Sequence, residues 1–266
     1  MTAVTATLPT RARDVLASEW IKLRSVRSTY TALIAAAVAA VAIGYLVTHF
    51  DVMHWATMSA KQKAGFDPVS DTFTGIGLAQ LAFGVLGVLA ISSEHTTGLI
   101  RTTFAAVPRR RAVLAGKAAV TGAVTLVVGE LIAFATFFVG QWVLSGRNLD
   151  VTLADPGVLR GVLAAGFYLT VMALVGLGLG SIIRHTAGAI TAMFGLVFLV
   201  PTVIHALPAP WDTRIGKYVL DNAAQQMIAQ HPHQGYFSAG TSFLICLAYA
   251  VAAIAAAAFL VTRRDA

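Results

Sequence analysis

The sequence predicts an all-α integral membrane protein that crosses the bilayer six times, and two observations carry this prediction. Hydrophobic residues make up 57% of the 266 residues and charged residues only 12%, whereas a soluble globular protein has about 45–50% apolar and about 25% charged residues. The apolar residues also stand in blocks of about twenty, the length that a helix needs to cross about 30 Å of hydrocarbon. Much of the folded surface is therefore expected to face lipid.

The N-terminal segment is expected to precede the first span as a helix at the membrane interface. Residues 1–10 are rich in Thr and Ala and are predicted to be disordered. Residues 11–27 form a basic, moderately amphipathic pattern with a tryptophan, which suits the boundary between headgroups and hydrocarbon. At about 100° per residue, its apolar side chains fall roughly opposite Ser18 and Lys22; they are Leu16, Trp20 and Leu23. The full-length apolar run that follows favours an uncleaved anchor over a signal peptide.

Six apolar runs follow, within a single transmembrane domain predicted over residues 28–262. The expected spans are residues 30–47, 73–92, 118–144, 161–183, 187–207 and 239–261. Each is long enough to cross the hydrocarbon core of a bilayer. The polar connections between them include residues 93–117, and residues 208–238, in which residues 215–230 are expected to form a short helix.

Three features inside the spans are candidates for packing or function. Gly176, Gly178 and Gly180 in the fourth span predict a small-residue face on which another helix can approach closely. Pro201 is expected to kink the fifth span. Glu130 lies near the middle of the third span, where an ionisable group is costly unless it is partnered or neutral. It is a candidate for the substrate path or for gating, and equally for a hydrogen-bonded packing residue.

The distribution of Lys and Arg predicts the orientation in the plasma membrane. If the N-terminus is cytoplasmic, thirteen of the 19 Lys and Arg residues fall in inner segments and six in outer segments. An excess of positive charge marks the cytoplasmic side. Six spans then return the C-terminus to the side on which the chain began, so both termini are expected to be cytoplasmic. The formal charge of +7 is attributed to this bias and to anionic headgroups, not to nucleic acid.

The long inner loop over residues 93–117 is the candidate site of a partner interaction. Residues 97–106 can form a short apolar and basic helix, which Pro108 would end because proline cannot continue a helix. The loop then becomes strongly basic at Arg109, Arg110 and Arg111. Such a helix offers a surface on which a partner could sit. The alternative interpretation is that the basic run only enforces topology and contacts headgroups.

Two motifs resemble one protein family. The first is Ser93-Glu94, Gly98, Arg101, Pro108-x-Arg110 and Lys117, placed between the second and third spans; the second is Ser18-Glu19-Trp20, Lys22-Leu23 and Arg27, ahead of the first span. Together with the six-span architecture they resemble the permease subunit of type-2 ABC (ATP-binding-cassette) exporters, of bacterial and actinobacterial type. The likeness in architecture covers the whole chain. It is sharpest over residues 14–30 and 92–118.

The resemblance implies a transporter subunit that works in a complex. In that family two permeases, identical or related, pair in the membrane, and a separate cytoplasmic ATPase binds ATP and Mg and drives each of them. The loop after the second span forms a coupling helix that docks on the ATPase. Carried over, the coupling residues would be Glu94, Gly98, Leu99, Arg101, Phe104, Pro108, Arg110 and Lys117. The interfacial helix beside them would contribute Glu19, Trp20, Lys22 and Arg27. The Arg109–Arg111 triplet is more basic than the family pattern. An apolar drug or a lipid-like compound is the family-level substrate.

Other site types lack a signature in the sequence. A phosphate-binding loop needs Gly-x-x-x-x-Gly-Lys-Ser/Thr, but Gly116-Lys117 and Gly216-Lys217 are followed by Ala and Tyr. We therefore expect no ATPase site, no enzyme activity and no cofactor in this chain. His231 and His233 flank a proline in a spacing that matches no established metal site, so no metal is expected.

Two further functional hypotheses remain open from the sequence alone. One is an ion-coupled secondary transporter that uses Glu130, which would be expected to have several intramembrane charges and an internal repeat. The other is a non-transporting membrane scaffold, which would need no coupling loop.

Overall fold

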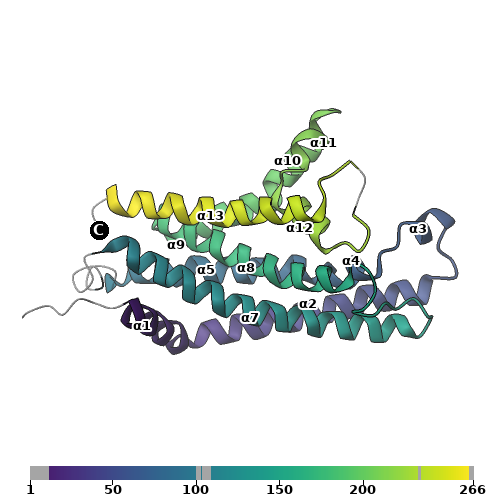
Figure 1. Cartoon of the computed structure of the whole chain (residues 1–266), viewed down its shortest axis with the longest axis horizontal. Helices are drawn as coiled ribbons and strands as arrows, with labels where there is room; N and C mark the ends of the chain where they lie inside the picture. Colours follow the sequence, from purple (N-terminus) through teal and green to yellow (C-terminus); the bar gives the residue numbers. More distant parts are fainter. Residues whose placement is uncertain (1–11, 100–102, 104–108, 233–234, 264–266) are drawn as a thin grey trace, which may run out of the picture.

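The computed structural model describes residues 12–99, 103, 109–232 and 235–263. These residues form helices and connecting loops and contain no strand, which confirms the predicted all-α fold. Six helical segments are long and apolar enough to span a membrane: Thr29–His54, Pro68–Thr96, Arg110–Ser145, Val158–Ile183, Thr186–His205 and Ala239–Arg263. They form an elongated bundle, from which the last part of the fifth segment projects (Figure 1). The predicted six spans are therefore present, with shifted ends.

The helices are named as in Figure 1. In chain order they are α1 (Ala12–Ser25), α2 (Arg27–His54), α3 (Ala60–Ala64), α4 (Pro68–Thr72), the 3₁₀ turn η1 (Phe73–Gly75), α5 (Ile76–Thr96), α7 (Arg110–Ser145), α8 (Val158–Ile183), α9 (Thr186–Phe194), the π-helical segment η2 (Gly195–Leu199), α10 (Val200–His205), α11 (Trp211–Gly216), α12 (Leu220–Ile228) and α13 (Ala239–Arg263).

Helix α8 is the centre of the bundle. Most of its 18-residue apolar stretch is buried, whereas a third or less of the corresponding stretch is buried in α2, α7, α9–α10 and α13. Glycines allow this burial because they let backbones touch. A Cβ on Gly176 would lie 2.1 Å from the carbonyl oxygen of Gly84, and one on Gly180 would lie 2.9 Å from that of Val88. Both therefore pack on α5. Gly178 does not share their face: it lies against Ala253 of α13.

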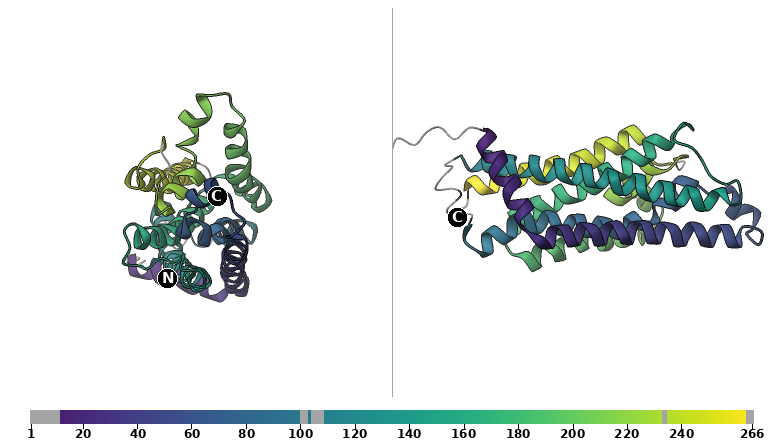
Figure 2. Two further views of the ribbon diagram at one scale, coloured as in Figure 1. Left: turned by 90° about the vertical axis from the view of Figure 1, so that its right-hand side faces the viewer. Right: turned by 90° about the horizontal axis from the view of Figure 1, so that it is seen from below.

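The N-terminal helix is separate from the first span. The sequence predicted one helix over residues 11–27, but α1 ends at Ser25 and Arg27 already begins α2. Between them Val26 adopts an extended conformation, with φ −91° and ψ 105°. This break lets the chain change direction, and Figure 2 shows α1 running steeply across the end of the bundle while α2 runs along it.

The second span begins earlier than its apolar run. Two short helices that were not predicted, α3 and α4, precede it in the connection that follows α2. Each carries a recognised start signal: Ser59 and Gln62 form a capping box at α3, and Asp67 caps α4 ahead of a proline at the first position. Hydropathy does not detect such helices, because their side chains are largely polar.

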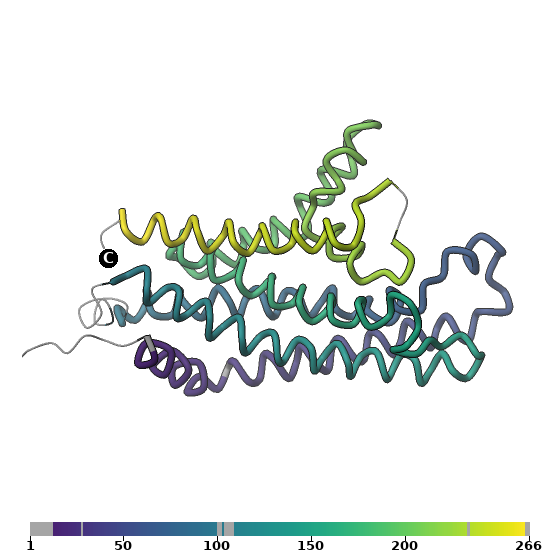
Figure 3. Tube along the Cα trace, in the orientation of Figure 1, coloured from purple at the N-terminus to yellow at the C-terminus, as the bar shows by residue number. Residues whose placement is uncertain are grey.

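The fifth span leaves the bundle. A π-helical segment, η2, ends two residues before Pro201, whose missing N–H removes one backbone hydrogen bond from the preceding turn. The trace in Figure 3 shows α10 and α11 projecting away from the other helices. Only 17% of the 18-residue apolar stretch of this span is buried. Most of its surface is therefore open to lipid or to another protein.

The connection over residues 208–238 holds two helices where one was expected over residues 215–230. Helix α11 ends at Gly216, and Val219, extended at ψ 134°, precedes α12. Helix α12 buries one apolar face against α8 and α13. It therefore covers the N-terminal end of the central helix α8.

The ends of four helices and the N-terminal helix α1 lie together at the opposite end of the bundle. The start of α7 lies beside the end of α13, because Arg110 Nη1 donates to the carbonyl oxygen of Val261 at 3.4 Å. The start of α9 lies beside the end of α5, because Thr186 Oγ1 donates to Ser92 Oγ at 3.0 Å. Helix α1 crosses this same end (Figure 1).

Candidate functional site

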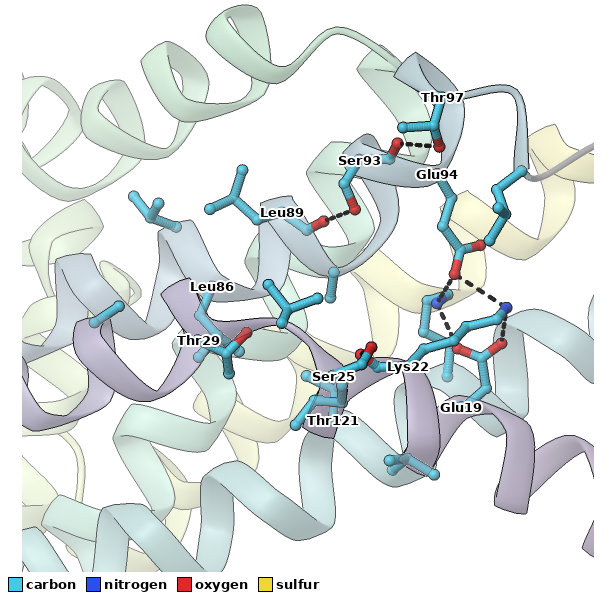
Figure 4. Close-up of a pocket in the computed structure, with 18 residues that line it drawn as sticks. Glu19, Lys22, Ser25, Thr29, Leu86, Leu89, Ser93, Glu94, Thr97 and Thr121 are labelled. Carbon is cyan, nitrogen blue, oxygen red and sulfur yellow. Dashed lines mark hydrogen bonds and ion pairs between the residues drawn. The ribbon is translucent and has the colours of Figure 1, made fainter.

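Four charged side chains from three helices form one cluster at this end of the bundle. Helix α1 supplies Glu19 and Lys22, and α5 supplies Glu94 (Figure 4). Helix α7 supplies Lys117. Lys117 Nζ lies 2.5 Å from Glu19 Oε2 and 2.8 Å from Glu94 Oε1. Lys22 Nζ lies 2.7 Å from Glu19 Oε1 and 3.1 Å from Glu94 Oε1. We call these four residues the charge cluster.

Burial makes the charge cluster energetically demanding. Glu19 is 3% exposed, Lys117 4% and Glu94 6%. A buried charge is tolerated when it is paired and hydrogen-bonded, and removing one partner of such a pair is strongly destabilising. The two carboxylates and two ammonium groups sum to zero charge. The cluster therefore ties α1, α5 and α7 together in one arrangement.

Lys22 is the solvent-facing member of the charge cluster. Its side chain is 28% exposed, whereas the other three are 8% exposed or less. Burial lowers the pKa of the Lys22 ammonium, but hydrogen bonds and the negative charges of Glu19 and Glu94 outweigh it and raise the pKa above its ordinary value. Lys22 is thus held in its charged form.

Local sequence explains how α1 reaches α7. Glu19 and Lys22 stand three residues apart and share a helix face. One turn earlier on that face, Val15 is 8% exposed and packs against Gly116, where a Cβ would lie 2.7 Å from Val15 Cγ1. Glycine at this position admits α1 and brings Lys117, the next residue, to Glu19. The buried face of α1 thus contains Val15 and Glu19, while Trp20 is 49% exposed.

The charge cluster lies at the root of the connection between α5 and α7. Gly98 has φ +73°, a left-handed conformation that glycine adopts without strain, and it turns the chain out of α5. Leu99 and Thr103 follow and are helical. Thr103 Oγ1 donates to the carbonyl oxygen of Leu99 at 3.0 Å and accepts from Lys22 Nζ at 3.5 Å. Lys22 therefore connects α1 to this loop directly.

The structure shortens the predicted loop over residues 93–117, because both of its ends belong to helices. Glu94 belongs to α5, and Arg110 and Lys117 belong to α7, whose helix starts eight residues before the third apolar run. Leu99 is 47% exposed. Arg27, predicted as part of the interfacial helix, starts α2 and is exposed. Three of the predicted coupling residues lie outside the described residues: Arg101, Phe104 and Pro108.

Glu130 lies apart from the charge cluster, in the middle of α7. It faces Gly166 of α8, where a Cβ would come within 2.5 Å of the Glu130 carboxyl carbon. Its Oε2 atom is buried and has no hydrogen-bond partner among the described residues. Gly166 thus makes room for a carboxyl group between two helices.

A second polar region, which the sequence did not reveal, lies at the end of the bundle opposite the charge cluster. A cavity of about 580 Å³ is lined by carboxyl groups of Asp67, Asp71 and Asp221 and reaches the buried Tyr168. Tyr168 donates a hydrogen bond to Gln80 Oε1 between α8 and α5. Burial raises the pKa of Asp221. Gln80 and Tyr168 could have indicated this polar region from the sequence, because both are polar side chains within otherwise apolar spans.

The histidines of the connection over residues 208–238 contribute one backbone contact. The backbone N–H of His231 donates to Asp67 Oδ2 at 3.1 Å. His233 lies outside the described residues. Within the described part of the chain, no group of three or more His, Cys, Asp or Glu side chains is arranged to hold a metal ion.

Comparison with known proteins gives no relative from which a role could be transferred. No protein-family model matches the chain, and no curated protein matches it. The geometry of the chain's own residues is therefore the basis for its functional interpretation.

Proposed function

We propose that the chain is the permease subunit of a type-2 ABC exporter in the plasma membrane, with both termini cytoplasmic. A separate cytoplasmic ATPase would bind ATP and Mg and supply the energy. A second copy, or a related permease, would complete the pathway by pairing in the membrane. The substrate class that the family resemblance implies is an apolar drug or a lipid-like compound.

The observation that carries this proposal is the charge cluster. Glu94 stands one turn before Gly98, where the chain leaves α5 for the predicted coupling helix. Through Lys117 and Lys22, Glu94 is bound to α7 and α1. A force applied to the loop would therefore reach three helices at once. A loop that served only to orient the chain would need no such connection.

The grouping of segments at one end of the bundle also supports the proposal. Helix α1, the α5–α7 connection, the α8–α9 turn and the end of α13 lie together there. These segments hold most of the Lys and Arg residues, which favour the cytoplasmic side. An ATPase bound at that end would meet the loop and the N-terminal helix together.

The proposed mechanism is a shift between two arrangements of the bundle. Closure of the paired ATPases would move the two coupling loops, and the charge cluster would carry α1, α5 and α7 with them. Such a shift needs partner contacts that differ between the two states. Helix α8, packed on α5 through glycines, would follow the movement. The weakly packed fifth span has the freedom to change its position.

Copurification from the native host tests the proposal. The full chain carrying an affinity tag is expected to bring down a nucleotide-hydrolysing subunit, identified by mass spectrometry and by ATP hydrolysis. Gly98→Pro should abolish this association, because proline cannot adopt φ +73°. The matched control is Gly240→Pro in the first turn of α13, where the backbone N–H has no intrahelical partner.

Two results would refute the proposal. One is uphill transport by the purified chain alone, with no nucleotide-hydrolysing partner. The other is a topology map that places residues 109–111 outside the cell.

A second candidate function rests on Glu130. Its buried, unpartnered Oε2 atom is the property expected of a carboxyl group that binds a transported proton or cation, as in an ion-coupled secondary transporter. The described spans contain no second central charge paired with it, so this candidate has the weaker support.

A further inference from the structure

A cavity lies between α10 and α12, at the end of the bundle opposite the charge cluster. Its volume is about 600 Å³, and ligand pockets in proteins have volumes of roughly 300–1,000 Å³. One wall is the end of the fifth span, with Pro201, Thr202 and His205, and the facing wall is the polar side of α12. Tyr236 completes the lining. We call this space the α10–α12 cavity.

Helix α12 presents oxygen acceptors to the α10–α12 cavity. Asp221, Asn222 and Gln225 line it, and all three are half-buried or exposed, so a ligand can reach them. Asn222 Nδ2 donates to the carbonyl oxygen of Gly216 at 2.9 Å. Gln225 Nε2 donates to Asp221 Oδ2 at 2.7 Å. An amide whose nitrogen is used in this way keeps its oxygen as an acceptor, and a carboxylate accepts several hydrogen bonds. The wall therefore offers two amide oxygens and one carboxylate.

The charge around this wall is negative. Asp221 and Gln225 also line the cavity of about 580 Å³ that reaches Tyr168, where Asp67 and Asp71 add two more carboxyl groups. Among the described residues that line the two cavities there is no Lys or Arg. A cleft lined by one sign of charge attracts ligands of the opposite sign. Burial raises the pKa of Asp221 because its carboxylate loses hydration, and a bound cation would compensate for that loss.

These acceptors select one ligand chemistry. A primary ammonium group carries one positive charge and three N–H donors, with no acceptor. It therefore matches one carboxylate and two amide oxygens. A hydroxyl group supplies a single donor and no charge, and a carboxylate would be repelled by Asp221. A metal ion is a poorer match, because the described residues contain no group of three or more His, Cys, Asp or Glu side chains arranged to hold one.

We propose that the α10–α12 cavity binds an organic cation through a primary ammonium group. Asp221 supplies the opposite charge and accepts one N–H, and the amide oxygens of Asn222 and Gln225 accept the other two. The apolar body of the ligand lies against Pro201 and the ring of Tyr236. The site belongs to this chain alone and does not depend on the proposed transport function.

Photolabelling of the purified full chain tests the site. The probe is a benzylamine with a photoreactive diazirine on its ring, and the labelled peptides are identified by mass spectrometry. Label is expected on residues 201–205, 221–226 or 236, and unmodified benzylamine should compete with it. Benzyl alcohol lacks the charge and should compete at least about tenfold less well. Benzyltrimethylammonium keeps the charge but has no N–H donor, and it should also compete about tenfold less well.

The two analogues can each refute the proposal. Equal competition by benzyl alcohol and benzylamine would show that the site does not recognise a cation. Equal competition by benzyltrimethylammonium and benzylamine would show that the three oxygens do not accept N–H groups. Label spread evenly over exposed helix faces would show that the cavity is not a binding site.

Three variants test the wall itself. Asp221→Asn keeps the shape of the side chain but removes its charge, so competition by benzylamine should weaken at least about tenfold. Asp150→Asn removes the same charge from an exposed position outside the cavity and should have no effect. Gln225→Glu adds a negative charge to the wall and should strengthen competition, a gain that a misfolded variant would not show. Unchanged competition in Asp221→Asn or in Gln225→Glu would overturn the proposal. Because no ATPase is present, failure here leaves the proposed transport function untouched.

Discussion

Lys117 of α7 binds Glu19 of α1 at 2.5 Å across 98 residues of sequence. Both side chains are at least nine-tenths buried. This contact fixes the N-terminal helix to the transmembrane bundle, and the bond from Lys117 to Glu94 extends the connection to the root of the α5–α7 loop. The position of α1 is thus set by charge pairing together with the close approach of Val15 to Gly116.

Removing the Lys117 ammonium should destabilise the protein strongly. Lys117→Met leaves Glu19 and Glu94 with one cation instead of two, and loss of one partner from a buried pair costs about 3–5 kcal/mol. Unfolding in mixed micelles with increasing denaturing detergent measures the change. Lys61→Met on the exposed helix α3 is the control and should be neutral. In a double-mutant cycle with Glu19→Gln, additive effects would show that the two residues are not coupled.

Stability at alkaline pH should report on Lys22. Because the folded-state pKa of Lys22 is raised above 10.5, protonation is favoured in the folded protein. Its contribution is therefore complete below the unfolded pKa and is lost as pH rises through the folded pKa. The wild type should be more stable than Lys22→Met near pH 8, and the difference should shrink above about pH 10.4. A difference that grows with pH would contradict this assignment.

Close packing between α5 and α8 should make Gly176 intolerant of a side chain. In Gly176→Ala the new Cβ would lie 2.1 Å from the carbonyl oxygen of Gly84, and the backbones must separate. Overpacking of this kind costs about 1–3 kcal/mol. Gly77→Ala in α5 meets nothing within 4 Å and should be neutral or stabilising by up to about 1 kcal/mol. The same unfolding assay compares the two; equal effects would argue against the close helix contact.

Glu130 should be dispensable for ATP-driven transport. Glu130→Gln keeps the shape of the side chain beside Gly166 but removes its ability to carry a proton. In the exporter proposed here, transport by the reconstituted complex should keep at least about half of its rate and the same dependence on external pH. Complete loss of transport in a correctly folded Glu130→Gln variant would favour the ion-coupled alternative.

Apolar runs predicted the six spans because bilayer thickness sets the length of a spanning helix. They did not predict the ends. Helix α7 starts at Arg110, well before its apolar run, because helical hydrogen bonding continues into the polar flank. The break at Val26 and the split between α11 and α12 also leave no mark in hydropathy. The sequence did contain the capping signals of α3 and α4, at Ser59 and Asp67.

The members of the candidate site could be named from the sequence, but their pairing could not. Glu19, Lys22, Glu94 and Lys117 each stand in or beside the two family-like motifs. Nothing in a linear pattern states that Lys117 lies between two carboxylates from different helices. That arrangement depends on helix crossings and on Gly116, so it required the structure. The same holds for Gly178, which sequence spacing grouped with Gly176 although the two face different helices.

The neutrality of the charge cluster has a consequence for how this chain can vary over evolution. Losing one lysine or one glutamate from the group would strand an opposite charge in a poorly hydrated interior. Tolerated changes should therefore occur as compensated pairs: a descendant without Lys117 should also lack Glu19 or Glu94, and drift at the four positions should be correlated even though they lie far apart along the chain.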